Sequence, residues 1–201
     1  MTDGTQKQWL DVPPYVAQLL GRFTYYASWL DDTLGEAVVI GNPHATEHAE
    51  STPGWARSGS QLVDAVLAIA PDQPVMQDIA RRLGNLNVIR NQLVHGVWLW
   101  EDEKVMVMKR QLGKGQRSIA YATYTYVEIE GFIRNYQQLG GIADKLVEML
   151  TKGNSSGVAL AESQSPTCTI EGDTMLAVVR NDLIVWECPT CRTWRSAVPE
   201  D

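Results

Sequence analysis

The chain has 201 residues, of which 44% are hydrophobic and 20% charged, and its formal net charge is -7. This composition is typical of a globular protein with one full core and a small appendage, and no apolar run approaches the ~20 residues of a membrane span. Residues 1–10 lack the basic and apolar pattern of a secretory signal, and three cysteines do not make a disulfide framework. We therefore expect a protein of the reducing cytoplasm with no membrane partner.

Four segments carry apolar residues at helical spacing and predict amphipathic helices. They span residues 15–34, 60–70, 75–94 and 129–150. Pro13-Pro14 suits the start of the first helix, and Thr125 with Glu128 forms a capping-box pattern before the fourth. Gly96 is expected to end the third helix in the left-handed conformation that glycine adopts cheaply. We expect a mainly α fold with a four-helix bundle in residues 1–152.

Between the first two helices, His44, Glu47 and His48 match the His-x-x-Glu-His spacing of inverted zinc proteases. The match lies between Asn42-Pro43 and the Ser-Thr-Pro-Gly run of residues 51–54, and this composition predicts a loop. A zinc-protease site of this kind needs a long helix. We interpret the segment as a surface loop with two exposed histidines.

The third helix ends in the run Arg90-Asn91-Gln92-Leu93-Val94-His95-Gly96. On a helix, Asn91 and His95 share a face about one turn apart, and Arg90 lies one position round. A cation, an amide and an imidazole are the groups that metal-free cleavage of a ribose-phosphate backbone requires, so Arg90, Asn91 and His95 are candidate catalytic residues. The alternative is a structural role, in which Arg90 and Asn91 are solvated or ion-paired and His95 interacts with the helix dipole.

This run resembles the signature of the HEPN superfamily (higher eukaryotes and prokaryotes nucleotide-binding). That signature is an Arg, often followed by Asn, then a His after four to six intervening residues. Four residues separate Arg90 from His95 here, and the His-Gly ending that many members share is present. The family carries its signature at the end of a helix within a small all-α bundle, and the resemblance spans roughly residues 10–151.

The resemblance implies a metal-independent endoribonuclease with no cofactor for catalysis. His95 would be the general base or acid, Arg90 would hold the phosphate, and Asn91 would orient His95 or donate to the same phosphate. The resemblance also implies an RNA substrate, a homodimer in which two signatures face one cleft, a toxin or defence role, and an antitoxin-like protein partner. The second hypothesis is a non-catalytic HEPN-like module that dimerises or binds a nucleotide or protein.

A β-hairpin is predicted after the signature, because Val97–Trp100 and Val105–Met108 flank a charged turn. A third β-prone run covers Ile119–Tyr126, so we expect an antiparallel insertion at about residues 97–125. Residues 80–117 form the only net-positive segment, with eight basic and three acidic residues. The candidate RNA-binding residues are Arg81, Arg82, Lys109, Arg110, Lys114 and Arg117. Alternatively, basic residues here protect a solvated hairpin edge from pairing.

The composition changes after the fourth helix, where residues 153–167 are predicted to be a flexible linker. The remaining segment, 168–201, contains a hairpin pattern in which Met175–Arg180 and Leu183–Trp186 flank Asn181-Asp182. We therefore expect a small β appendage on the helical domain.

Cys188-Pro189-Thr190-Cys191 follows this hairpin and is typical of a zinc-ribbon knuckle. A closed tetrahedral zinc site needs four ligands, and Cys168 supplies only a third. The fourth ligand would be a carboxylate such as Glu171 or Asp173, a water, or a group from a partner chain. The alternatives to a structural zinc are a metal-free hairpin with ordinary cysteines and, less favoured, a redox pair.

Overall fold

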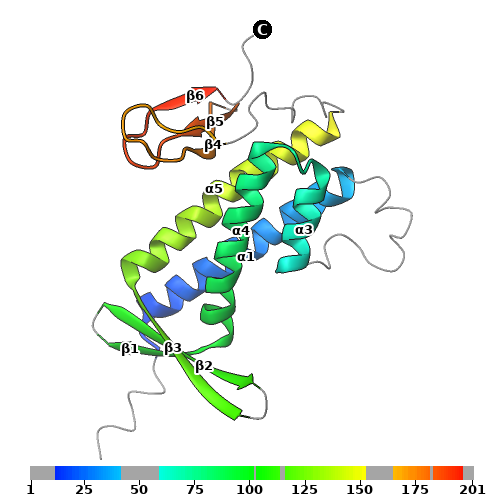
Figure 1. Cartoon of the computed structure of the whole chain (residues 1–201). Helices are drawn as coiled ribbons and strands as arrows, with labels where there is room; N and C mark the ends of the chain where they lie inside the picture. The colour runs from blue at the N-terminus through cyan, green and yellow to red at the C-terminus, as the bar shows by residue number, and fades with distance from the viewer. Residues whose placement is uncertain are drawn as a thin grey trace, which may run out of the picture.

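The computed structural model describes residues 12–41, 59–101, 103–113, 116–152, 165–181 and 183–196. These residues form four helices and two small three-stranded antiparallel sheets (Figure 1). The helices are α1 (Pro14–Gly41), α3 (Ser60–Ile69), α4 (Pro74–His95) and α5 (Tyr126–Thr151). The mainly α class is confirmed, and each of the four predicted apolar stripes lies in a helix. The described part contains no helix that is both long and apolar enough to cross a membrane.

Helices α1 and α5 lie side by side along much of their length (Figure 1). Helix α1 continues seven residues beyond the predicted stripe because Ala37 and Val38 are also buried. Gly140 of α5 lets the two helices approach closely, since a Cβ there would lie 2.3 Å from Cζ3 of Trp29. Helix α3 packs on α1 and α4 and covers the remaining side of the core.

Phe23, Tyr136 and Leu86 join three helices at the centre of the core. The rings of Phe23 and Tyr136 meet edge to face with centroids 5.3 Å apart. The buried Tyr136 hydroxyl donates to the carbonyl of Leu86 at 3.3 Å, so the one polar atom of this ring has a partner. Burial raises the pKa of Tyr136, which keeps this hydroxyl a neutral donor.

Helix α5 begins as the sequence predicts. The Thr125 hydroxyl accepts from the backbone N–H of Glu128 at 3.2 Å, and the Glu128 carboxylate accepts from the backbone N–H of Thr125 at 2.7 Å. These reciprocal bonds satisfy donors that a helix start otherwise leaves free. The same contacts lower the pKa of Glu128.

Helix α4 ends at His95. The left-handed conformation predicted for Gly96 is wrong. Gly96 is extended, with φ -91° and ψ 161°. A Cβ at this position would lie 2.1 Å from Cγ1 of Val107 and 2.6 Å from the carbonyl oxygen of Gln92. Glycine is therefore required for the close approach of β2 to the end of α4, rather than for a positive φ.

The insertion is a sheet of β1 (Val97–Glu101), β2 (Lys104–Gly113) and β3 (Gln116–Thr125) in the order β1-β2-β3. Val105 and Val107 of β2 are buried against the helices. The indole of Trp98 donates to the carbonyl of Leu93 at 2.6 Å, which fixes the sheet to the last turn of α4. The predicted insertion is thus present, and it holds the signature end of α4 in place.

The tail contains the predicted hairpin, β4 (Leu176–Arg180) with β5 (Leu183–Glu187), and a short β6 (Trp194–Ser196) that the sequence pattern did not indicate. Its sheet lies at the opposite end of the helical body from β1–β3 (Figure 1). Buried residues of the tail, Ala177 and Trp186 among them, belong to the same apolar core as the helices. The tail is therefore packed on the helical domain in the described residues.

Asp78 and Arg82, both buried on α4, bind the backbone N–H and the backbone carbonyl of Ala177 in β4. The Asp78 carboxylate accepts from the N–H of Ala177 at 3.3 Å, and Arg82 donates to the carbonyl of Ala177 at 2.9 Å. Arg82 also donates to Gln138 of α5 at 3.1 Å. These bonds attach the edge of the tail sheet to two helices.

Candidate functional site

Arg90 extends from α4 to α1, where its Nη1 lies 2.5 Å from Oδ2 of Asp31. The side chains are 27% and 15% exposed, so the ion pair lies in the seam between the two helices at its solvent edge. Burial raises the pKa of Asp31, while the charge and hydrogen bond of Arg90 act in the opposite direction. A guanidinium has five N–H donors. Asp31 is the one acceptor of Arg90 within the described residues.

Asn91 and His95 are both exposed on the last turns of α4. Their spacing places them on one helix face, with Val88 two turns before His95 and 60% exposed. The structure therefore brings Asn91 and His95 to the same surface and directs Arg90 beside it, toward α1. The predicted convergence of all three on one phosphodiester stays a prediction.

Two aromatic residues of the sheet bind this segment, one at a side chain and one at the backbone. The Tyr124 hydroxyl of β3 donates to the side-chain carbonyl of Gln92, inside the signature run. Trp98 binds Leu93 on the other side of the same turn. Burial, and then the charge of Glu128, raise the pKa of Tyr124, so its hydroxyl keeps its proton. The end of α4 is thereby attached to the sheet by two hydrogen bonds.

Lys109, a predicted RNA-binding residue, contacts the signature segment. Its Nζ lies 3.5 Å from the carbonyl oxygen of Asn91. Arg81 is exposed and pairs with Asp78, with Nη2 at 2.5 Å from Oδ1. Arg82 is buried in its contacts with Ala177 and Gln138, and burial lowers its pKa against the charge of Asp78. Its guanidinium thus has structural partners in place of a phosphate.

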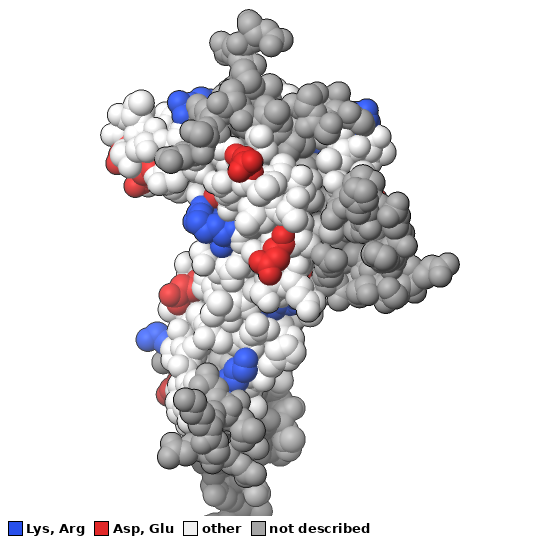
Figure 2. Space-filling view, turned by 45° about the vertical axis from the view of Figure 1, so that its right-hand side comes forward, with Lys and Arg blue, Asp and Glu red and all other residues white. Residues whose placement is uncertain are grey.

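The remaining basic candidates are placed by their backbone alone. Arg110 pairs with Ile119 and Arg117 with Leu112 in the β2–β3 ladder, while Lys114 lies outside the described residues. Basic and acidic side chains are interspersed on the face drawn in Figure 2, and no continuous basic surface is seen there. His44 and His48, with the inverted zinc-protease spacing, also lie outside the described residues.

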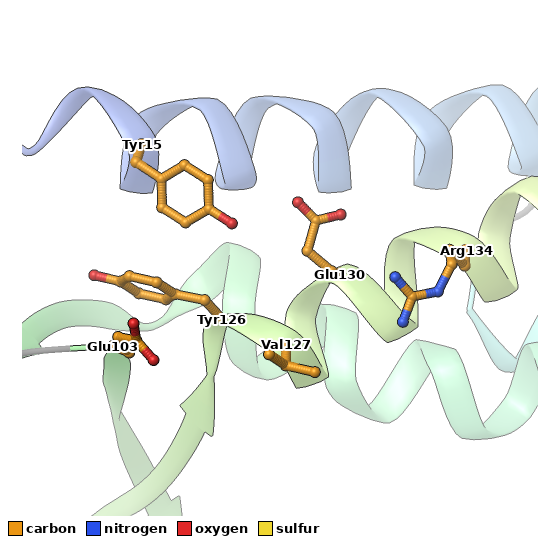
Figure 3. Close-up of a pocket in the computed structure, with 6 residues that line it drawn as sticks. All are labelled: Tyr15, Glu103, Tyr126, Val127, Glu130 and Arg134. Carbon is orange, nitrogen blue, oxygen red and sulfur yellow. The ribbon is translucent and has the colours of Figure 1, made fainter.

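A separate pocket of ≈ 490 Å³ opens at the first turns of α1 and α5 (Figure 3). Tyr15 and Tyr126 line it with ring centroids 5.1 Å apart. Glu130 of its wall is already paired with Arg22, at 2.7 Å. The pocket is lined by Tyr15, Glu103, Tyr126, Val127, Glu130 and Arg134. It contains none of the signature residues.

Cys168, Cys188 and Cys191 form a cluster in the tail, with their sulfur atoms all within 4.8 Å of one another. The Sγ atoms of Cys168 and Cys191 are 3.5 Å apart. Tetrahedral zinc with Zn–S bonds of about 2.3 Å separates two sulfur ligands by about 3.8 Å, so this spacing fits such an ion. The three cysteines could therefore hold a metal.

Backbone N–H groups point at two of these sulfur atoms. Those of Glu171 and Ile170, and then the Thr193 hydroxyl, lower the pKa of Cys168 to about 6. Cys188 accepts from the N–H groups of Cys191 and Thr190 in the same way, although burial raises its pKa overall. Donors aimed at sulfur stabilise thiolates, which are the form that binds metal.

Comparison of the chain with family models, with curated proteins and with solved structures finds no match. The site is therefore defined by its own geometry. Sequence patterns had indicated the cysteines and the signature. They do not indicate Asp31. Its pairing with Arg90 depends on contact between α1 and α4, because the two residues are 59 positions apart in the chain. Nor do these patterns indicate Asp78, whose acceptor role appears only when the tail is packed.

Proposed function

We propose that this protein is a HEPN-type, metal-independent endoribonuclease that cleaves RNA at the C-terminal end of α4. The observation that carries the proposal is the exposure of Asn91 and His95 on one face of the last turns of α4. Arg90 supports it, because its partly exposed guanidinium is oriented by Asp31 and retains further donors. The sheet contacts of Gln92 and Trp98 support it too, since a catalytic group needs a rigid backbone.

In the proposed reaction, the 2′-oxygen of a ribose attacks the adjacent phosphorus and the bond to the 5′-oxygen breaks. His95 accepts the 2′-hydroxyl proton as general base, and an imidazolium protonates the leaving 5′-oxygen. Arg90 and Asn91 donate to the phosphate oxygens, on which negative charge increases in the transition state. The products are a 2′,3′-cyclic phosphate and a 5′-hydroxyl.

A homodimer is part of this proposal, because one imidazole alone must otherwise serve as both base and acid. Val88 shares the exposed face of Asn91 and His95, and Val97 just beyond the helix is 56% exposed. Apolar side chains around a polar pair suit a self-complementary contact that brings two copies of the face together. Light scattering at micromolar concentration should give about twice the monomer mass, and a strictly monomeric protein would count against a shared cleft.

The RNA backbone is proposed to pass over the signature beside Lys109. Arg81, Arg110, Lys114 and Arg117 remain proposed further contacts. Lys109→Ala should weaken RNA binding and reduce the salt dependence by about one phosphate contact. Lys104→Ala is the matched control, since Lys104 is exposed at the first position of the same strand. Equal losses of RNA affinity in both variants would indicate non-specific electrostatic attraction rather than a defined RNA-binding path beside Lys109.

The catalytic proposal is tested by His95→Ala in the presence of EDTA. The variant should lose cleavage of single-stranded RNA and keep the thermal melt of the parent, because His95 is exposed. Asn85→Ala, an exposed position on the same helix, is the matched control and should retain activity. Cleavage that persists in His95→Ala, or that needs a divalent metal, would show that His95 is not the catalyst.

A non-catalytic HEPN-like module that dimerises or binds a nucleotide or protein is the second candidate. The ion pair of Arg90 with Asp31 favours it, because the charge of the guanidinium is already matched. Incubation with RNA distinguishes the two candidates, because the binding module would bind its ligand or dimerise without producing 2′,3′-cyclic phosphate ends. A toxin or defence role with an antitoxin-like partner belongs to the catalytic candidate alone.

We also propose that the tail holds a structural zinc through Cys168, Cys188 and Cys191. The ion would crosslink two loops and the β5 strand, so its contribution would be to stability of the tail. Elemental analysis should find close to one zinc per chain, and Cys191→Ser should lower that content. A metal-free protein with an ordered tail would contradict the zinc. Free thiols at these positions also suit the reducing cytoplasm that we propose as the compartment.

A further inference from the structure

The loop after Cys168 and the loop after Cys188 have the same backbone hydrogen bonds. The N–H of each cysteine donates to the carbonyl five residues on: Cys168 to Asp173 at 2.8 Å, and Cys188 to Thr193 at 2.9 Å. The carbonyl of each cysteine accepts from the residue four positions on, Gly172 at 2.9 Å and Arg192 at 3.1 Å. The two loops are therefore equivalent turns offset by 20 residues in the sequence.

Backbone dihedrals and sulfur contacts extend the equivalence. Gly172 and Arg192 both have positive φ, 75° and 62°. Arg192 adopts this conformation without being glycine, which is uncommon and indicates that the turn requires it. In each loop, the cysteine sulfur accepts from the N–H groups two and three residues on. Both loops thus have the form of a metal-binding knuckle.

The second ligand of the Cys188 knuckle is Cys191, three residues on. The residue three positions after Cys168 is Glu171. Because the turns share their hydrogen bonds and the positive φ that follows, the Cα–Cβ bond of Glu171 is directed as that of Cys191 is. The carboxylate oxygens of a glutamate are three bonds from Cβ, whereas the sulfur of a cysteine is one bond from it, so the glutamate reaches two bonds further.

We infer that Glu171 is the fourth ligand of the metal, giving a three-thiolate, one-carboxylate site. This inference rests on the proposed zinc in the tail and names the group that completes it. Carboxylate oxygen is an accepted zinc ligand in tetrahedral sites. The Glu171 side chain is exposed and its carboxylate is not part of the cluster of three sulfur atoms in the structure, so it would turn inward when the ion binds.

The other oxygen groups at the site are engaged elsewhere. Asp173 accepts from the Thr190 hydroxyl at 2.5 Å, a bond that joins the two knuckles. The Thr193 hydroxyl lies 3.0 Å from the sulfur of Cys191 and 3.6 Å from that of Cys168. A neutral hydroxyl at those distances serves as a hydrogen-bond partner of the thiolates rather than as a ligand of zinc. Glu171 is the remaining carboxylate of the two knuckles.

A carboxylate at the exposed corner makes the site different from a closed four-cysteine knuckle. Oxygen binds zinc less strongly than thiolate does and exchanges more readily with water. The three sulfur atoms would therefore hold the metal most strongly, and its release or exchange would begin with loss of the bond to Glu171. This geometry predicts a weaker, more labile zinc than four thiolates would give.

The test measures zinc affinity of the full chain by competition with a chromophoric chelator. Glu171→Ala should bind zinc at least about tenfold more weakly, and Glu171→Cys at least about tenfold more tightly, than the parent. Glu36→Ala, an exposed glutamate on α1, is the matched control and should not change the affinity. With Co²⁺ in place of zinc, the thiolate absorption of Glu171→Cys should grow in proportion to four sulfur ligands rather than three.

Different outcomes test the Glu171 ligand and the structural zinc separately. If the parent binds no zinc, the structural zinc itself is wrong. If the parent binds zinc and Glu171→Ala binds it equally well, the zinc stands and Glu171 is not its ligand. Loss of affinity in Asp173→Asn, with Glu171→Ala unchanged, would overturn the assignment in favour of the neighbouring carboxylate.

Discussion

Arg90 and Asp31 form an ion pair that connects the signature end of α4 to the middle of α1, with 2.5 Å between Nη1 and Oδ2. Burial raises the pKa of Asp31 even with this partner present. The pair therefore has two roles in this account: it orients the guanidinium, and it supplies the positive charge that keeps a partly buried carboxyl ionised.

Arg90→Ala should lower the free energy of unfolding by about 2 kcal/mol at neutral pH, because it leaves a partly buried carboxylate unpaired. The pKa of Asp31 should rise further in the folded variant and stay ordinary in the unfolded chain. The folded state then binds a proton that the unfolded state has lost, so stability should fall as pH rises. Urea melts between about pH 5 and about pH 7 check this, with the parent as reference.

A shallower pH dependence in Arg90→Ala than in the parent would contradict this role. Asp31→Ala separates stability from catalysis, because it removes the buried acid and leaves Arg90 in place. If Asp31 orients the guanidinium, that variant should cleave RNA more slowly, while a merely structural Asp31 would leave the rate per folded molecule unchanged.

Gly140→Ala should destabilise the helical core. The added methyl would lie 2.3 Å from Cζ3 and 2.6 Å from Cη2 of Trp29, and an overpacked core contact costs about 1 to 3 kcal/mol. Gly141→Ala is the matched control on the next residue of α5, because a Cβ there meets nothing within 4 Å. That variant should be unchanged or up to about 1 kcal/mol more stable. The melting temperature should therefore fall in Gly140→Ala and not in Gly141→Ala, and equal shifts would contradict the Trp29 contact.

Thr125→Ala should cost about 1 kcal/mol by removing the cap of α5. The pKa of Glu128 is lowered by its bonds from Thr125, so the folded state releases this proton more readily than the unfolded state. The contribution of Glu128 is fully present above its unfolded pKa and is lost as pH falls through its folded pKa. The variant should lose part of this acid-side dependence, as measured by denaturation from about pH 5 downward. An unchanged acid profile would indicate that the box does not stabilise the helix in solution.

Asp78→Ala should release the tail from the helices. It removes the acceptor of the Ala177 N–H and the carboxylate that pairs with Arg82, whose Nη1 lies 3.4 Å from Oδ2 of Asp78. Loss of one partner of a buried ion pair costs about 3 to 5 kcal/mol. Limited proteolysis should then cut the tail faster while the helical domain stays resistant. Arg81→Ala is the control, because the exposed Arg81 side chain should contribute less than about 1 kcal/mol. A tail that stays protected in Asp78→Ala would contradict the attachment.

The helices were predictable because each has a long apolar stripe, and the α5 start because the Thr125–Glu128 cap is local. The two hairpins were also predictable, because their β-prone runs are adjacent in the sequence. The Cys168, Cys188 and Cys191 cluster was predictable as a set of ligands, although its fourth member was left open among several groups. The paired turns of the tail and the bond between Asp173 and Thr190 distinguish Glu171 from Asp173.

What the sequence did not predict depends on contacts between distant segments. Asp31 and Asp78 are ordinary acidic residues of helices until α4 meets α1 and the tail. Arg82 was predicted to bind RNA because its segment is basic, yet its burial depends on the packed tail. The usual helix ending predicts a left-handed conformation for Gly96. The structure instead requires glycine there because Val107 approaches the position of a Cβ.

The central claim is that RNA is cleaved by attack of its own 2′-hydroxyl without a metal. The most direct measurement uses one short single-stranded RNA and its 2′-O-methyl copy, each incubated with the protein in EDTA, with the product ends identified by mass. We expect 2′,3′-cyclic phosphate and 5′-hydroxyl ends from the RNA and no cleavage of the 2′-O-methyl copy. Cleavage of both strands, products with 3′-hydroxyl ends, or no cleavage of either strand by the dimeric protein would contradict it.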